Sequence, residues 1–245
     1  MFLFFNIEYL PNKFDNYKNI TNVCFKHMFM DDNVITELKP DTRNRLLNTA
    51  QGLFAKQGFK ATSLRQITQK AEANVASVNY YFGSKEGMLN ELIRRRVEPV
   101  NKRRYALLEK YRVEAAGQPI PLKKIFEAFL LPFFQSVAPY SERDTMDLIQ
   151  IIDRLTEQPR LRQAVLEEHF RKLSITILEA LSETLPGLEE AELHWRFHFS
   201  VSLMLSSMST RQRVRNFSKG LCDPEDIEGM VTRLINFICA GFRAR

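Results

Sequence analysis

The chain has 245 residues, of which 44% are hydrophobic and 26% are charged, so it can bury a core of one or two domains. Cys24, Cys222 and Cys239 are too far apart for a cysteine metal site, and their odd number favours a reduced, cytoplasmic location. No stretch approaches the roughly 18 uninterrupted apolar residues that a membrane span needs, so we expect no membrane partner.

Positive charge is concentrated in one segment. The net charge is +6, but residues 41–112 contain 15 Lys/Arg and only 6 Asp/Glu. Residues 1–40 contain 4 and 5, and residues 113–245 contain 16 and 18. A local excess of this kind is typical of a surface that neutralises nucleic-acid phosphates. The alternative is an ordinary solvated helix face.

Residues 1–38 show no sustained helical period. Their apolar start, MFLFF, has no basic residue before it, which does not fit a secretory signal. We interpret this stretch as an N-terminal extension that is either disordered or the result of a mis-assigned start, with a short amphipathic anchor as the alternative. We assign no function to it.

Three short helices are predicted from Asp41 to Phe82. The first is capped by Asp41 or Thr42 and runs to about Gln57, where Gly58 suits a left-handed C-cap. Its apolar stripe consists of Leu46, Leu47, Ala50, Leu53 and Phe54. Together with the next two helices it can bury a small core, which is the usual scaffold for a recognition helix.

The second and third helices form a helix-turn-helix pattern. Thr62 or Ser63 caps the second, and Asn74 caps the third, since a side-chain oxygen there accepts a free N–H of the first turn. Along the third helix, residues 75–82, we expect Val75, Val78 and Phe82 to face inward. The opposite face presents Ser77, Asn79, Tyr80 and Tyr81. Such a helix fits the major groove, where base edges present distinct donor and acceptor patterns.

The run RLLNTAQGLFAKQGFKATSLRQITQKAEANVASVNYYFGSKEGML resembles the N-terminal DNA-binding domain of the TetR family of transcriptional regulators. The resemblance implies a domain at about 39–100 with its helix-turn-helix at about 63–82. Three residues depart from the pattern: Glu72 and Ala76 stand where Gly is common, and Asn74 where Ser is common. Glu72 requires a backbone conformation that Gly adopts more easily.

The resemblance also implies roles for individual residues. Asn79 is suited to reading adenine, and Val75 and Ala76 to contacting a thymine methyl. The tyrosines and Lys85 would contact phosphates, as would the start of the second helix. The predicted DNA-binding residues are Thr62, Ser63, Arg65, Val75, Ala76, Ser77, Asn79, Tyr80, Tyr81 and Lys85.

A long helix is predicted from Ser84, with Pro99 expected to kink or interrupt it. Its basic runs, Arg94–Arg96 and Lys102–Arg104, fit a solvated face better than a phosphate-binding one. A turn-rich linker, Val113–Pro121, marks the domain boundary. Beyond it we expect only helices, at about 146–155, 161–185, 188–217 and 227–242, after an aromatic helix near 125–134. The fold class is therefore all-α, with a larger helical ligand-binding and dimerisation domain at 113–245.

This C-terminal domain suggests an effector site. Phe126, Phe129 and Phe133 either line a ligand cavity or form plain core. The stretches ELHWRFHFSVSLMLSSMSTRQRVRNF and INFICAGFRAR resemble a fatty-acid-responsive subgroup of TetR-type repressors. That resemblance implies a small hydrophobic effector such as a fatty acid or acyl-CoA, with a cation at the tunnel mouth. The candidates for this cation are Arg143, Arg154 and Arg196.

The predicted function is a homodimeric, ligand-responsive repressor that binds a palindromic operator in double-stranded DNA. The family's dimer face uses the last two long helices, where Ser202, Met204, Ser206, Ser207 and Met208 allow close approach. His194 and His198 have zinc-ligand spacing but lack a third ligand, so we predict no metal, no cofactor and no enzymatic activity. The alternatives are an architectural or activating DNA-binding protein without an effector, and an all-helical small-molecule enzyme or carrier.

Overall fold

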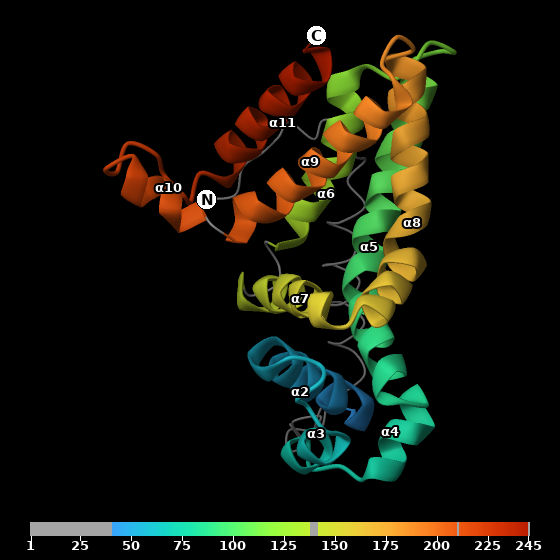
Figure 1. The fold of residues 1–245 in the computed structure, drawn as a ribbon, viewed down its shortest axis with the longest axis vertical. Coiled ribbons are helices and arrows are strands. Elements are labelled where there is room, and N and C mark those ends of the chain that lie inside the picture. The colour runs from blue at the N-terminus through green and yellow to red at the C-terminus, as the bar shows by residue number, and fades with distance from the viewer. Residues whose placement is uncertain (1–40, 138–141, 210, 245) are drawn as a thin grey trace, which may run out of the picture. The chain divides into compact units, whose positions relative to one another are not determined.

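The computed structural model describes residues 41–137, 142–209 and 211–244, and its regular elements in these ranges are all helical. The predicted extension at 1–38 lies outside the described residues. Figure 1 shows the helices in chain order, beginning with α2. In the described part of the chain, no helix is both long enough and apolar enough to cross a membrane.

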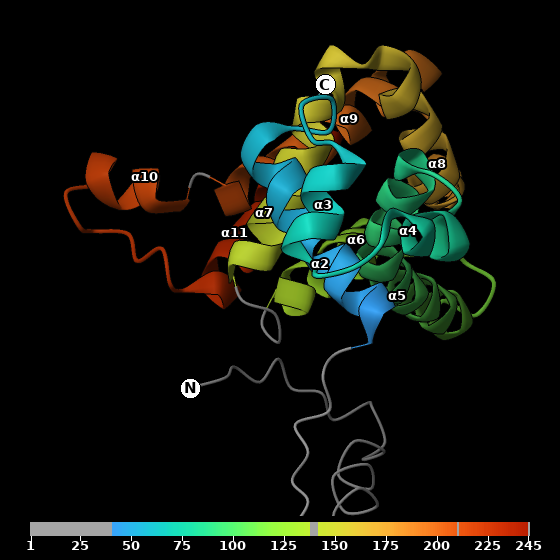
Figure 2. The same ribbon diagram turned by 90° about the horizontal axis from the view of Figure 1, so that it is seen from below.

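The first three helices confirm the predicted N-terminal unit. They are α2 (Thr42–Gln57), α3 (Leu64–Lys70) and α4 (Val75–Phe82). Asp41 caps α2 and Asn74 caps α4, the latter by accepting the N–H of Ala76 at 2.9 Å. Of the two candidate caps for α3, the structure selects Ser63, which forms a capping box with Gln66. In Figures 1 and 2, α3 and α4 lie at the same end of the described unit as α2.

Helix α5 (Lys85–Glu114) leads from α4 into the second half of the chain. Pro99 lies inside it and the helix continues past it, so of the two expected effects, a kink or an interruption, the interruption does not occur. A proline removes one backbone N–H, and thirty residues of packed helix tolerate that single loss. The turn after α5 falls inside the predicted linker.

The C-terminal helices match the predicted order, with two differences. They are α6 (Leu122–Val137), α7 (Glu142–Arg154), a 3-10 turn η1 (Leu155–Glu157), α8 (Pro159–Thr184), α9 (Glu190–Ser209), α10 (Arg211–Phe217) and α11 (Ile227–Arg243). Helix α7 begins before the expected Met146. The single helix expected at 188–217 is two helices, α9 and α10, on either side of residue 210.

Two apolar clusters form the core. The larger joins the C-terminal half of α5 with α6, α8, α9 and α11. The smaller, here called the head core, holds the buried residues of α2, α3, α4 and the first half of α5. It also contains Ile151, Leu155 and Val165, which come from α7, η1 and α8. The head core is therefore completed by residues far along the chain.

Candidate nucleic-acid interface

The inner face of helix α4 packs against the head core. Val78 is fully buried in the head core, and Phe82 is half-buried beneath the guanidinium of Arg43, 5.7 Å from the ring centroid. The junction to α5 is equally tight, because a Cβ on Gly87 would lie 2.0 Å from the carbonyl oxygen of Phe82. Only glycine fits at this position. Close packing at the junction therefore fixes the angle between α4 and the following helix α5.

The front of α4 is exposed. Asn79 and Ala76 are exposed, Ser77 is half-buried, and Tyr80 is 84% exposed. Tyr81 is 37% exposed, and its ring meets that of Tyr80 edge-on with ring centroids 5.0 Å apart. This arrangement leaves polar and aromatic groups free on one short helix face.

The expectation that Val75 faces inward is wrong, since it is 41% exposed. It is the first residue of α4, directly after the Asn74 cap. Its exposure leaves it on the accessible side of the helix, together with Ala76.

The start of α3 contains residues with different surroundings. Arg65 is exposed, and Ser63 is exposed with its hydroxyl engaged in the capping box. Thr62 is buried, and its hydroxyl donates to the carbonyl oxygen of Gly58 at 2.8 Å. It also accepts from Gln57 at 3.2 Å. The Thr62 side chain therefore fixes the connection between α2 and α3 rather than pointing outward.

Lys85 is also engaged internally. Its Nζ donates to the carbonyl oxygens of Phe59 at 2.9 Å and Thr62 at 2.8 Å, and lies 4.2 Å from the centroid of the Phe59 ring. Burial lowers the pKa of this ammonium group. An ammonium has three N–H donors, so one remains after these two bonds. Lys85 positions the loop before α3 and keeps one donor for another acceptor.

The turn of the helix-turn-helix has the strained geometry expected from its sequence. Glu72 has a φ of 50°, in the left-handed region that glycine occupies at lower cost. Arg45 of α2 secures this turn, since its Nε donates to the carbonyl oxygen of Ala71 at 3.3 Å. The angle between α3 and α4 is thus tied to α2.

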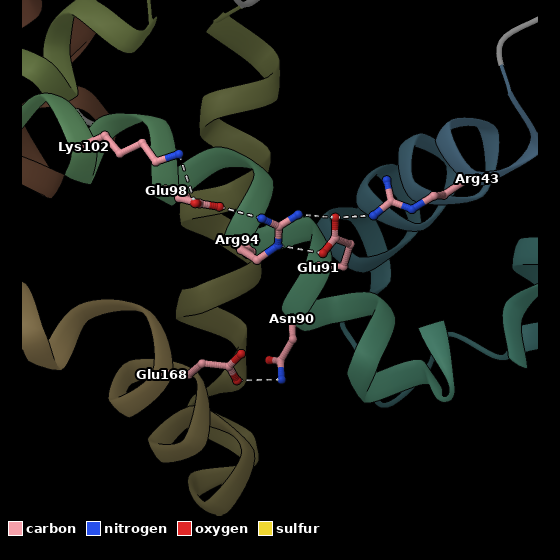
Figure 3. Close-up of polar contacts among 7 residues, drawn as sticks. All are labelled: Arg43, Asn90, Glu91, Arg94, Glu98, Lys102 and Glu168. Carbon is pink, nitrogen blue, oxygen red and sulfur yellow. Dashed lines mark hydrogen bonds and ion pairs between the residues drawn. The ribbon is translucent and has the colours of Figure 1, made fainter. Parts of the chain in front are cut away.

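Figure 3 shows an ion-pair network that joins α2 to α5. Glu91 accepts from Arg94 at 2.8 Å and also pairs with Arg43 of α2. The Arg94 hydrogen bond, followed by that of Arg43, holds the pKa of Glu91 at about 2 despite partial burial. Arg94 pairs further with Glu98, which reaches Lys102 at 3.3 Å. Two cations of the basic runs, Arg94 and Lys102, are therefore paired with carboxylates within α5.

A second polar contact joins α5 to α8. Asn90 donates to Glu168 at 2.9 Å, also drawn in Figure 3. Farther along α5, Asn101 donates to the carbonyl oxygen of His169 at 3.1 Å. The helix that carries α4 is thus hydrogen-bonded to the C-terminal half at two levels.

Three predicted effector residues lie on α6. Phe126 is fully buried against Phe242, with ring centroids 5.0 Å apart, and Phe129 packs on Phe197 at 5.5 Å. Phe133 is half-buried and meets Phe134 edge-on. In this structure they contribute to the larger apolar cluster.

Two of the predicted cations, Arg154 and Arg196, donate to backbone carbonyl oxygens. Arg154 is exposed and donates to the carbonyl oxygen of Lys56 in the last turn of α2 at 3.0 Å. Arg196 donates to three carbonyl oxygens at the end of α11, those of Gly241, Phe242 and Ala244, at 2.9–3.0 Å. A cation there also complements the helix dipole. The side chain of Arg143 lies outside the described residues.

The sequence interpretation missed Arg104. The sequence interpretation placed it in a solvated basic run. In the structure Arg104 is 4% exposed, and its side chain extends from α5 to contact α6 and α9. Its register gives the reason, because it falls on the apolar stripe of α5 at spacings of three and four. The other members of this stripe are Val97, Val100, Leu108 and Tyr111. Helical spacing could have separated Arg104 from its exposed neighbours.

The outer faces of α9 and α11 carry exposed aromatic side chains. Trp195 and Phe199 are 58% and 54% exposed and stack at 5.7 Å, and Phe237 of α11 is 68% exposed. Ser202 and Ser206 are also exposed, whereas Met204 and Met208 are buried. An open pocket lies beside Trp195, lined by Glu189, Glu190, Ala191, His194 and His198.

Two family models match this chain. Residues 46–92 match the model described as bacterial regulatory proteins, tetR family. Residues 127–241 match the one described as tetracyclin repressor-like, C-terminal domain. Together these matches span more than half of the chain. The chain belongs to the TetR family.

Other TetR-family proteins are similar over parts of the chain. YttP of Bacillus subtilis is 38% identical over 56 residues, which are 23% of this chain and 27% of YttP. The repressor KstR2 of Rhodococcus jostii is 26% identical over 145 residues, 59% of this chain and 67% of KstR2. The match with YttP thus spans about a quarter of that relative's length.

A solved structure shares the fold. NalD, the secondary repressor of the MexAB-OprM multidrug efflux pump in Pseudomonas aeruginosa, superposes with a TM-score of 0.56 at 19% identity. The match covers 82% of this chain and 96% of NalD. It supports the all-α architecture, with an N-terminal helix-turn-helix and a larger helical C-terminal domain.

Proposed function

We propose that this protein is a transcriptional repressor that binds a palindromic operator as a homodimer and releases it when a small hydrophobic effector binds. The exposed front of α4 carries the proposal, since Asn79, Tyr80 and Ser77 stand on a short helix whose back is locked into the head core. A major groove admits one such helix, and an asparagine amide can read adenine through two hydrogen bonds.

The surroundings of α4 support the same proposal. Arg65 at the start of α3 is exposed, and the third N–H of Lys85 is available at the start of α5. Cations on both sides of a recognition helix would fix its register on the phosphate backbone. YttP and KstR2 are named as helix-turn-helix regulators of transcription, which favours that function for this chain.

Dimerisation is supported by the exposed aromatic face of α9 and α11. Trp195, Phe199 and Phe237 would be buried between two copies, and exposed large side chains of this kind are typical of interfaces. One three-helix head buries little surface on DNA, so two heads one turn apart are needed for tight, specific binding.

The effector is expected to be a fatty acid or its acyl-CoA, bound in the C-terminal domain near α6. The aromatic residues Phe126, Phe129 and Phe133 supply an apolar environment for it. The contacts of α7 with α2 would transmit a movement of the C-terminal helices to the helix-turn-helix.

A gel-shift titration with the DNA upstream of the protein's own gene tests this proposal. At low salt the purified protein should retard a fragment that contains an inverted repeat, with two protomers in each complex. Retention of that affinity after scrambling of the repeat would reject operator recognition, and a complex containing one protomer would reject the dimer.

A further inference from the structure

A buried cation, Arg104, lies against the larger apolar cluster. Arg104 is 4% exposed, and in the described part of the chain no Asp or Glu pairs with its guanidinium. Burial lowers its pKa to about 10. A charge held away from water without an opposite charge is costly, so its presence in an apolar core calls for a functional reason.

The acceptors that Arg104 has are neutral. Its Nε donates to the carbonyl oxygen of Phe129 at 2.8 Å, and Nη1 donates to Asn101 at 3.2 Å. Nη2 reaches only the thioether sulfur of Met204, at 3.5 Å. A guanidinium has five N–H donors and sulfur is a weak acceptor. Arg104 therefore retains donor capacity on the side that Met204 occupies.

The position of Arg104 suits a ligand that bridges helices. Phe129 belongs to α6 and Met204 to α9, and Asn101 links the group onward to the carbonyl oxygen of His169 on α8. The guanidinium also lies 4.6 Å from the centroid of the Phe129 ring, which packs at a tilt against Phe197. A cation and an apolar aromatic surface thus adjoin each other, and the flexible side chain of Met204 can move aside at low cost.

We propose that Arg104 anchors the carboxylate of an anionic, amphiphilic effector, whose apolar tail packs against the Phe129 and Phe197 rings. The carboxylate would displace the Met204 sulfur and accept two parallel hydrogen bonds from the guanidinium, which supplies the missing negative charge. This inference rests on the proposed function, because it names the class of effector that the C-terminal domain takes. It also replaces Arg154 and Arg196 as the expected cation.

Calorimetric titration of the full chain with saturated carboxylates tests the charge requirement. Octanoate, dodecanoate and hexadecanoate are each compared with the primary alcohol of equal length, below their micellar concentrations. Because hydrogen bonds to charged groups are the stronger ones, at least one acid should bind about tenfold or more tightly than its alcohol. Equal binding of acid and alcohol, or no binding of any of the three acids, would overturn the proposal.

Three variants test the residue. Arg104→Gln should abolish the preference for acid over alcohol. Arg103→Gln changes the exposed neighbouring residue, and this control variant should retain the preference. Arg104→Lys keeps the charge but loses the two-pronged geometry, so the acid should bind about 3- to 10-fold more weakly. If Arg104→Gln does not fold, Arg104→Lys decides alone, and unchanged acid affinity in that variant would reject the anchor.

Gel shifts on the same preparations separate this inference from the proposed function. Operator binding without acid binding that depends on Arg104 would reject the anchor and leave the repressor proposal standing. Acid binding that depends on Arg104, in a protein that retards no DNA, would keep the anion site and reject the repressor proposal.

Discussion

The guanidinium of Arg154 on α7 donates a 3.0 Å hydrogen bond to the carbonyl oxygen of Lys56, in the last turn of α2. Beside this bond, Ile151 and Leu155 are buried in the head core. Helix α7 and the η1 turn that follows it therefore contact the N-terminal helices through Arg154, Ile151 and Leu155. Any rearrangement of the C-terminal helices that moves α7 must also disturb the end of α2.

Loss of this bond should loosen the end of α2. In Arg154→Ala we expect faster amide hydrogen exchange in the last turn of α2, and a fall of about 0.5–1 kcal/mol in the free energy of unfolding because the bond is exposed. Arg160→Ala removes an exposed arginine at the start of α8 and serves as the control. Unchanged exchange in Arg154→Ala would show that the apolar contacts alone couple the two parts.

Asn79 and Arg65 should affect DNA binding differently. Asn79→Ala is expected to weaken binding to the operator by about 1–3 kcal/mol and to leave non-specific binding unchanged, because a base-reading contact is lost. Arg65→Ala should weaken both kinds of binding and reduce the salt dependence by about one unit. Fluorescence-anisotropy titrations at several salt concentrations measure both effects. The same effect of Asn79→Ala on operator and random DNA would contradict a reading role.

Acid should weaken the link between α2 and α5. The pKa of Glu91 is about 2 in the folded protein and near 4.5 when the chain is unfolded. Because the folded pKa is the lower one, the stability from this carboxylate is complete above pH 4.5 and is lost as the pH falls toward 2. We expect Glu91→Gln to be less stable by about 1–2 kcal/mol at pH 7 and to show a shallower loss in that interval.

Urea denaturation at a series of pH values measures this effect. Glu109→Gln, an exposed glutamate on the same helix, is the control and should follow the wild type throughout. Parallel curves for Glu91→Gln and the wild type between pH 4.5 and 2 would mean that the ion pairs of Glu91 contribute nothing.

Replacing the strained residue of the turn should stabilise the protein. Glu72 has a φ of 50°, so Glu72→Gly removes a left-handed conformation that costs about 1–2 kcal/mol in a residue with a Cβ. Greater freedom of glycine in the unfolded chain offsets part of this, leaving a gain of about 0.5–1 kcal/mol. Ala73→Gly, one residue later, should instead destabilise. A lower melting temperature in Glu72→Gly would show that its side chain makes a compensating contact.

A charge in the exposed aromatic face should separate the proposed dimer. Phe237→Glu places a carboxylate opposite Trp195 or Phe199 of a second copy, and we expect a shift from two subunits to one in sedimentation-velocity experiments at micromolar concentration. Val113→Glu changes an exposed apolar residue at the end of α5 and should leave the mass unchanged. A Phe237→Glu protein that remains dimeric would place the interface elsewhere.

Local signals predicted the head accurately because its boundaries are set by local chemistry. Cap residues such as Asp41 and Asn74, and the apolar spacing of residues such as Leu47 and Phe54, act within a few positions of the chain. The start of α3 at Ser63 and the strain at Glu72 follow from the same short-range rules.

Long-range relationships were beyond such signals. Neither the bonds of Lys85 to the loop before α3 nor that of Arg154 to Lys56 can be read from spacing, because each depends on how helices pack. Arg104 was hidden by its charge, which placed it with its exposed neighbours although its register matched the apolar stripe.

The residues that complete the head core limit how this regulator can be recombined. Ile151, Leu155 and Val165 belong to the same buried cluster as Leu47 and Phe54, so a fragment ending near residue 100 would lack part of that core. A chimaera that joins this reader to a foreign sensor at that point should misfold unless the sensor's own helices present matching apolar groups. In this protein the sequence of the C-terminal helices and that of the N-terminal helices are therefore constrained to change together.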